Sequence, residues 1–166
     1  MDKRSIIICS FLTLIFGTAL HFVYEPLPFL WPVAPVNESV WEHLKLLVFP
    51  FFAFFGAASA IKKQFNPLAL WTGAVSGMAF IALFFYTYTA FTKTHILWVD
   101  ILSFVLAVAL AAVVYKAVPA GKGRAAGIIL SAALVAAMVL LTLFPPQIPL
   151  FMDPAGFYGM PVQSNI

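Results

Sequence analysis

Five apolar stretches, each close to the ~20 residues that an α-helix needs to cross the hydrocarbon layer of a bilayer, take up most of this 166-residue chain. Only 9% of the residues are charged and 63% are hydrophobic, whereas a soluble domain has about 25% charged and about 45–50% apolar residues. Such a chain can neither coat a soluble globule with polar side chains nor remain disordered. The sequence therefore predicts an all-α, polytopic membrane protein built as a bundle of five transmembrane helices.

The predicted helices belong to a single integral membrane domain that covers residues 1–166. Their expected ranges are 5–24, 37–61, 68–89, 94–115 and 125–144. The connection at 25–36 contains four prolines, which forbid a regular helix, and yet it is apolar. We expect this Pro-rich loop to lie at the outer membrane surface, where a tryptophan ring such as that of Trp31 prefers to sit. Residues 145–166 form a predicted outer tail, and Asn37 and Thr94 are the expected N-caps of the second and fourth helices.

The basic residues predict how the helices are oriented. Seven of the nine lie on the side that holds the N-terminus and the turns after the second and fourth helices, namely Lys3, Arg4, Lys62, Lys63, Lys116, Lys122 and Arg124. Because positively charged residues collect on the cytoplasmic side of a membrane, we expect a multi-pass protein of the cytoplasmic membrane with its N-terminus in the cytoplasm and its C-terminus outside. The bilayer is the expected partner. The net charge of +3 is explained by the basic residues that orient the helices, and no nucleic-acid partner is expected.

Acidic residues and histidines gather at the outer ends of the predicted helices. A charged side chain at membrane depth costs about 2.5–3.5 kcal/mol on insertion scales, so such residues usually face a partner or a cavity. Imidazoles and carboxylates are the common ligands of a catalytic divalent metal such as zinc. The expected metal ligands are His21, His43, His95 and Asp100. The candidate general bases are Glu38 and Glu42, supported by Glu25, Lys45 and Asp153.

Several functions are compatible with this cluster. An enzyme of this kind would be a metal-assisted intramembrane hydrolase that acts on a lipid or peptide at the outer leaflet. Alternatively, the cluster is a hydrogen-bond network in a structural or assembly subunit, with Lys45 neutralising Glu38 and Glu42 and with Asp100 paired to His95. A third option is a component that transports a small solute, a cation or protons, and a homo-oligomer would give it more room. Because the chain has no HExxH or comparable spacing, the metal, the substrate and the choice between these functions stay open.

Three segments carry a resemblance to a known family: FGTALHFVYE (16–25), PVNESVWEHLKLLVFP (35–50) and IPLFMDPAGFYG (148–159). In these segments the chain resembles a family of small multi-pass prokaryotic membrane proteins of unknown function. All three map to the predicted outer face, where the acids and histidines gather. The turn-forming DPAG sequence around Asp153 further predicts that the tail packs as a cap over this face.

Overall fold

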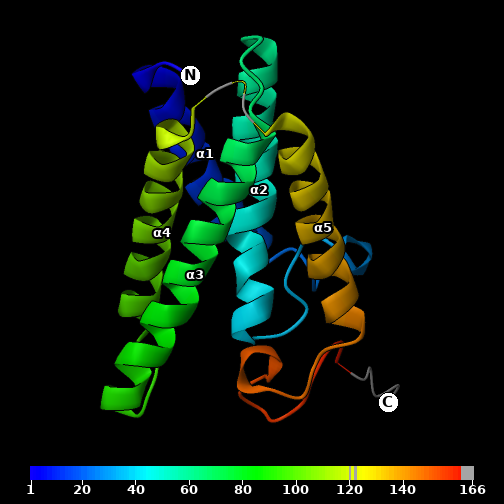
Figure 1. The fold of residues 1–166 in the computed structure, drawn as a ribbon. Helices are drawn as coiled ribbons and strands as arrows, with labels where there is room; N and C mark the ends of the chain where they lie inside the picture. Colours follow the sequence, from blue (N-terminus) through cyan, green and yellow to red (C-terminus); the bar gives the residue numbers. More distant parts are fainter. Residues whose placement is uncertain (120, 122, 162–166) are drawn as a thin grey trace.

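Helix α2 (Val40–Ile61) lies at the centre of the bundle in the computed structural model, and the other four helices contact it (Figure 1). The structure describes residues 1–119, 121 and 123–161. The surrounding helices are α1 (Lys3–Leu20), α3 (Pro67–Thr92), α4 (Leu97–Ala117) and α5 (Arg124–Leu143). Two single turns of 3₁₀ helix, η1 (Pro28–Leu30) and η2 (Pro149–Phe151), lie before α2 and after α5.

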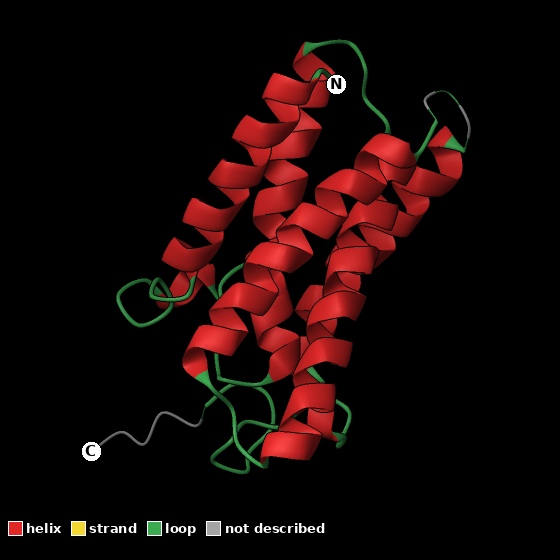
Figure 2. Cartoon of the chain, turned by 90° about the vertical axis from the view of Figure 1, so that its left-hand side faces the viewer, coloured by secondary structure: helices red, strands yellow, loops and turns green. Residues whose placement is uncertain are grey.

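Within the described residues, five helices are long and apolar enough to cross a membrane, in agreement with the predicted all-α architecture and the predicted number of helices. Figure 2 shows them running side by side, with the connecting loops gathered at the two ends. Helix α2 is the most enclosed, because 56% of its most apolar segment is buried against 28% or less in the other helices. Phe51 and Phe55 of α2 are fully buried and stack on each other in the core.

The connection between α1 and α2 is longer than predicted. Helix α1 gives way after Leu20 to turns with i→i+3 hydrogen bonds, and α2 begins only at Val40. The predicted N-cap at Asn37 is wrong, because the cap is Ser39, whose Oγ accepts a hydrogen bond from the Glu42 amide at 3.4 Å. The Asn37 amide side chain instead donates to the carbonyl of Gly159 at 2.7 Å. The Asn37 side chain, which the local sequence predicted to cap the helix, is therefore used in a tertiary contact with the C-terminal segment.

The turn between α3 and α4 also differs from the prediction. Helix α3 continues to Thr92 and ends at Lys93, which adopts the left-handed conformation with φ of 59°. The predicted cap at Thr94 is wrong, because its hydroxyl donates to the carbonyl of His95 and α4 starts at Leu97. The bounds of α5 lie within one residue of the prediction. Lys122 and residues 162–166 of the predicted tail lie outside the described residues.

Glycines allow the helices to approach one another at two places. In α3, Gly73 and Gly77 face α4, where an added Cβ would lie 2.8 Å from Ala111 O and 3.1 Å from Ala107 O respectively. In α1, a Cβ on Gly17 would collide with the Leu46 carbonyl of α2. Gly17 and Leu46 lie about one helical turn from His21 and His43 respectively, so this backbone contact sets the spacing of those imidazoles.

Replacing Gly17 by alanine is expected to push α1 away from α2 and lower the free energy of unfolding by about 1–3 kcal/mol, the usual cost of overpacking. Chemical or thermal unfolding of the detergent-solubilised protein measures this loss. The matched control is Gly56→Ala in α2, where the new Cβ meets only Leu70 Cδ1 at 3.7 Å. Alanine favours a helix over glycine, so the control should be at least as stable as the wild type. An equal loss in both variants would contradict the close-contact role of Gly17.

Charged residues separate between the two ends of the bundle. The start of α1, the ends of α2 and α4 and the start of α5 meet at the top of Figure 1, where the described basic residues are Lys3, Arg4, Lys62, Lys63, Lys116 and Arg124. Lys62 pairs there with Asp2. The other end, called here the histidine end, consists of the end of α1, the start of α2, the α3–α4 turn and residues 144–160.

Candidate functional site

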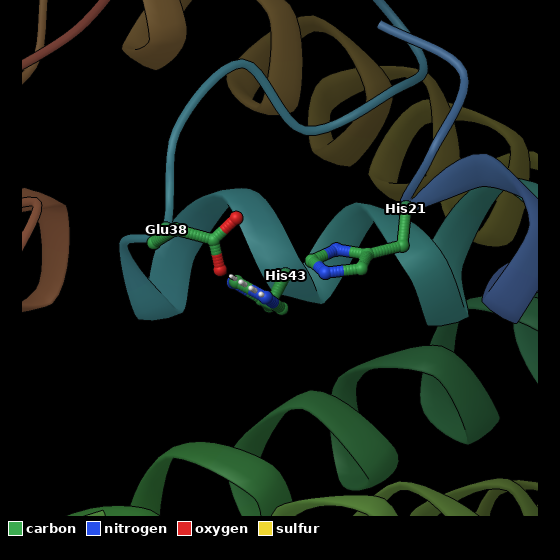
Figure 3. Close-up of side chains that lie close together, drawn as sticks. All are labelled: His21, Glu38 and His43. Carbon is green, nitrogen blue, oxygen red and sulfur yellow. Dashed lines mark ion pairs between the residues drawn. The ribbon is translucent and has the colours of Figure 1, made fainter. Parts of the chain in front are cut away.

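Two histidines and one glutamate from separate segments meet at the histidine end. His21 follows the last residue of α1, Glu38 precedes α2, and His43 lies in the first turns of α2 (Figure 3). One potential ligand atom from each residue lies within 4.8 Å of the other two. The imidazole centroids of His21 and His43 are 5.1 Å apart, and His43 Nε2 lies 3.3 Å from Glu38 Oε2. We call this group the His21–Glu38–His43 cluster.

The backbone of α2 fixes the orientation of the His43 ring. His43 Nδ1 lies 2.9 Å from the Ser39 carbonyl oxygen, which can only accept a hydrogen bond. Nδ1 therefore carries a proton, and Nε2 is turned toward Glu38. Nε2 is also protonated when it donates a hydrogen bond to the Glu38 carboxylate, so a metal ion that binds Nε2 must displace that proton. A carbonyl that holds the second nitrogen of an imidazole in this way is the usual support of a metal-binding histidine.

The surroundings of Glu38 and His21 favour the protonation states of these two residues that bind a cation. The hydrogen bond to His43 lowers the pKa of the Glu38 carboxyl below its ordinary value, and the histidine charges act in the same direction. Burial lowers the pKa of His21, and the neighbouring His43 adds to this effect. Within the described part of the chain, the buried His21 Nδ1 has no hydrogen-bond partner. A carboxylate and a neutral imidazole are the forms that coordinate metals.

Glu42 and Lys45 form a separate, completely enclosed ion pair. Lys45 Nζ lies 2.7 Å from Glu42 Oε2, and both side chains are at most 2% exposed. Lys45 also donates to the carbonyl oxygens of Trp31 at 3.0 Å and Ala34 at 3.4 Å. An ammonium group has three donors, and here each of them has an acceptor. Lys45 is therefore a saturated structural cation.

The Glu42 carboxylate is equally well satisfied. Its Oε1 accepts a hydrogen bond from the Thr142 hydroxyl of α5 at 2.6 Å, and its Oε2 accepts one from the Val36 amide at 3.1 Å besides the Lys45 ion pair. These contacts tie α2 to α5 and to the Pro-rich loop. Because both of its oxygens already accept hydrogen bonds from fixed donors, Glu42 has structural contacts in this fold, and its role as a general base stays a prediction.

Breaking this pair on one side should be far more damaging than removing it. Lys45→Met or Glu42→Leu alone leaves a buried charge without its partner, which costs about 3–5 kcal/mol. The double variant Glu42→Leu/Lys45→Met removes both charges and is expected to recover most of that loss. Unfolding of the purified variants in the same detergent measures the interaction free energy between Glu42 and Lys45. A double variant that is as unstable as the sum of the two single variants would contradict the ion-pair interpretation.

The remaining predicted site residues are distributed around the cluster. Asp153 is buried in the C-terminal segment, where its Oδ2 accepts the Glu38 amide at 2.8 Å. His95 Nδ1 lies 3.6 Å from Asp100 Oδ2 in the α3–α4 turn, and the two do not belong to the three-residue cluster. Glu25 is exposed. The three histidines thus share one end of the bundle, but only two of them meet.

Two polar residues of the histidine end were missed by sequence reasoning. The Tyr88 hydroxyl of α3 donates to Asp100 and accepts the Ile96 amide at 3.1 Å, and so it joins α3 to the start of α4. The hydroxyl-rich run YTYTAFTKT gives no sign that this tyrosine has such partners. Thr142 lies 100 residues from Glu42 in the sequence, and a lone threonine in an apolar helix gives no sign of such a partner.

The fold and this cluster describe an all-helical protein with five helices able to cross a membrane and a group of potential metal ligands at one end. The chain belongs to a family of unknown function, DUF6512, whose model matches residues 1–160. This agrees with the expectation, drawn from the sequence, of a family of unknown function. Searches of curated proteins and of solved structures gave no match.

Proposed function

We propose that this chain is a multi-pass membrane protein that binds a divalent transition-metal ion at the His21–Glu38–His43 cluster. The observation that carries the proposal is the approach of one donor atom from each residue to within 4.8 Å of the others. Three segments of the chain must be brought together for this approach, namely the end of α1, the segment before α2 and α2 itself. The contact of His43 Nδ1 with the Ser39 carbonyl supports the proposal, as does His21 Nδ1, which is buried and has no hydrogen-bond partner among the described residues.

The donor set favours one class of metal. Two imidazole nitrogens and one carboxylate oxygen suit zinc and its first-row neighbours, whereas calcium and magnesium prefer oxygen ligands alone. Three protein ligands leave a position for water, which is the arrangement of catalytic zinc sites. With Glu38 as a ligand and Glu42 held in its ion pair, a hydrolase at this site would depend on the metal-bound water as its nucleophile.

Titration of the metal-free protein with Co²⁺ or Zn²⁺ tests the proposal. We expect one bound ion per chain, with a Co²⁺ absorption spectrum typical of nitrogen and oxygen ligands. His21→Ala and His43→Ala should each weaken binding by at least about tenfold, since even outer-sphere partners of a metal site have effects of this size. Elemental analysis after purification without chelators gives an independent count.

The matched control is His95→Ala. This imidazole also lies at the histidine end, but its side chain is 68% exposed and it is not part of the cluster. Binding by the control should equal that of the wild type. Absence of bound metal in the wild type would overturn the proposal, as would equal effects of all three histidine variants. The cluster would then be a hydrogen-bond network of the structural kind.

We further propose that the histidine end faces the outside of the cytoplasmic membrane. Six of the eight described basic residues gather at the other end, which supports a cytoplasmic location for that end. In a Cys9→Ala background, a membrane-impermeant thiol reagent should label Met160→Cys on intact cells. It should label Lys3→Cys only after the cells are permeabilised. Both positions are exposed, so access to the reagent depends on sidedness. Labelling of both positions from the same side would refute this orientation.

A further inference from the structure

Glu38 is held in place by the C-terminal segment as well as by His43. Its backbone amide donates to Asp153 Oδ2 at 2.8 Å, across 115 positions of the sequence. The Glu38 side chain extends from this anchored backbone toward His43. One residue therefore links a proposed ligand of the metal to residues 144–160, which we call the C-terminal strap.

Asp153 lies in a tight, internally bonded turn of the strap. Its Oδ1 accepts the Ala155 amide at 2.7 Å, its backbone amide donates to the Phe157 carbonyl, and Gly156 adopts φ of 88° to close the turn. The residue is only 6% exposed. Both carboxylate oxygens thus have fixed donors, and the turn presents Oδ2 to Glu38 in a single direction.

The strap is attached to the start of α2 by two more contacts. Phe151 of η2 packs on Trp41, with ring centroids 4.8 Å apart, and the Asn37 side chain donates to Gly159 O at 2.7 Å. Asn37 and Trp41 flank the segment that carries Glu38 and the helix N-cap Ser39. The strap consequently touches the metal-binding segment at three points, and only the Asp153 contact is made to a member of the cluster.

We infer that the C-terminal strap controls the metal affinity of the cluster, with Asp153 as the positioning residue that acts through Glu38. This inference rests on the metal site proposed above. When the strap is docked, Asp153 holds the Glu38 backbone where its carboxylate meets His43 and His21. When the strap is undocked, the Glu38 segment loses this anchor, and the three donor atoms are no longer held in position before the metal binds. By thermodynamic linkage, the bound metal must stabilise the docked strap by the same factor.

A double-mutant cycle separates this role from a general effect on folding. Asp153→Ala should weaken Co²⁺ binding by about tenfold, within the range for residues that orient metal ligands. In a Glu38→Gln background, the same Asp153→Ala change should have little further effect, because the ligand through which it acts is already impaired. A loss of stability spread over the whole fold would weaken binding equally in both backgrounds. Asp153→Asn keeps one carbonyl oxygen and serves as the milder variant if the alanine variant does not fold.

Asp2→Asn is the control for the removed charge. Asp2 is an acidic residue at the opposite end of the bundle, paired with Lys62, and its loss should leave Co²⁺ affinity unchanged. Linkage supplies a second readout, hydrogen exchange of the Glu38 and Ala155 amides. In the wild type, Zn²⁺ should slow this exchange, and in Asp153→Ala it should have no such effect at the Glu38 amide.

The outcomes distinguish this inference from the function on which it rests. A wild type that binds no metal overturns both. A wild type that needs His21 and His43 for binding, but whose affinity is the same after Asp153→Ala and Asp153→Asn, retains the metal site and overturns control by the strap. An equal loss of Co²⁺ affinity from Asp153→Ala in both Glu38 backgrounds also overturns control by the strap. So does hydrogen exchange of the strap amides at a rate that Zn²⁺ does not change.

Discussion

The buried ion pair between Glu42 and Lys45 is the interaction on which the histidine end depends. Two opposite charges with at most 2% exposure can persist in an apolar bundle only if every donor and acceptor is satisfied. Here the remaining hydrogen bonds of the pair are made with the carbonyls of Trp31 and Ala34, the Val36 amide and the Thr142 hydroxyl. A Pro-rich segment that forms no α-helix obtains part of its backbone hydrogen bonds in this way. The ion pair thus turns an irregular loop into a fixed support for the residues that follow it.

The His21–Glu38–His43 cluster is built on this support from three sides. The close approach at Gly17 brings the end of α1 to α2, the first turn of α2 orients His43 through Ser39, and the loop delivers Glu38. The C-terminal strap then anchors Glu38 from outside the bundle through Asp153. Structural and ligand-binding roles are therefore divided among the acids. Glu42 and Asp153 satisfy backbone and side-chain donors. The carboxylate of Glu38 pairs with His43, but its side chain is 62% exposed and is therefore accessible to an incoming ion.

Sequence reasoning recovered the residues of this region but not their partners. His21, Glu38, His43, Lys45 and Asp153 were all singled out because ionisable groups near the end of an apolar helix need a reason to be there. The sequence did not show which of these residues contact one another. Glu38 and Glu42 both fell within the helix predicted over 37–61, but Glu38 precedes the helix because Ser39 is the cap. Asp100 and His95 were assigned to the same set, yet Tyr88 holds Asp100 at the start of α4.

What the sequence by itself determined is the class of structure: apolar runs of spanning length, few charges and their separation between two ends dictate five helices and a polar end. These properties depend on local composition and on hydrogen bonding within each helix, so they need no knowledge of neighbours. The tertiary structure alone decided which acid pairs with Lys45, which two histidines meet and how the strap reaches Glu38. Contacts such as Glu42 with Thr142 join residues 100 positions apart. Side chains at such separations meet only after the helices have packed, and packing depends on the shapes of all the surfaces at once.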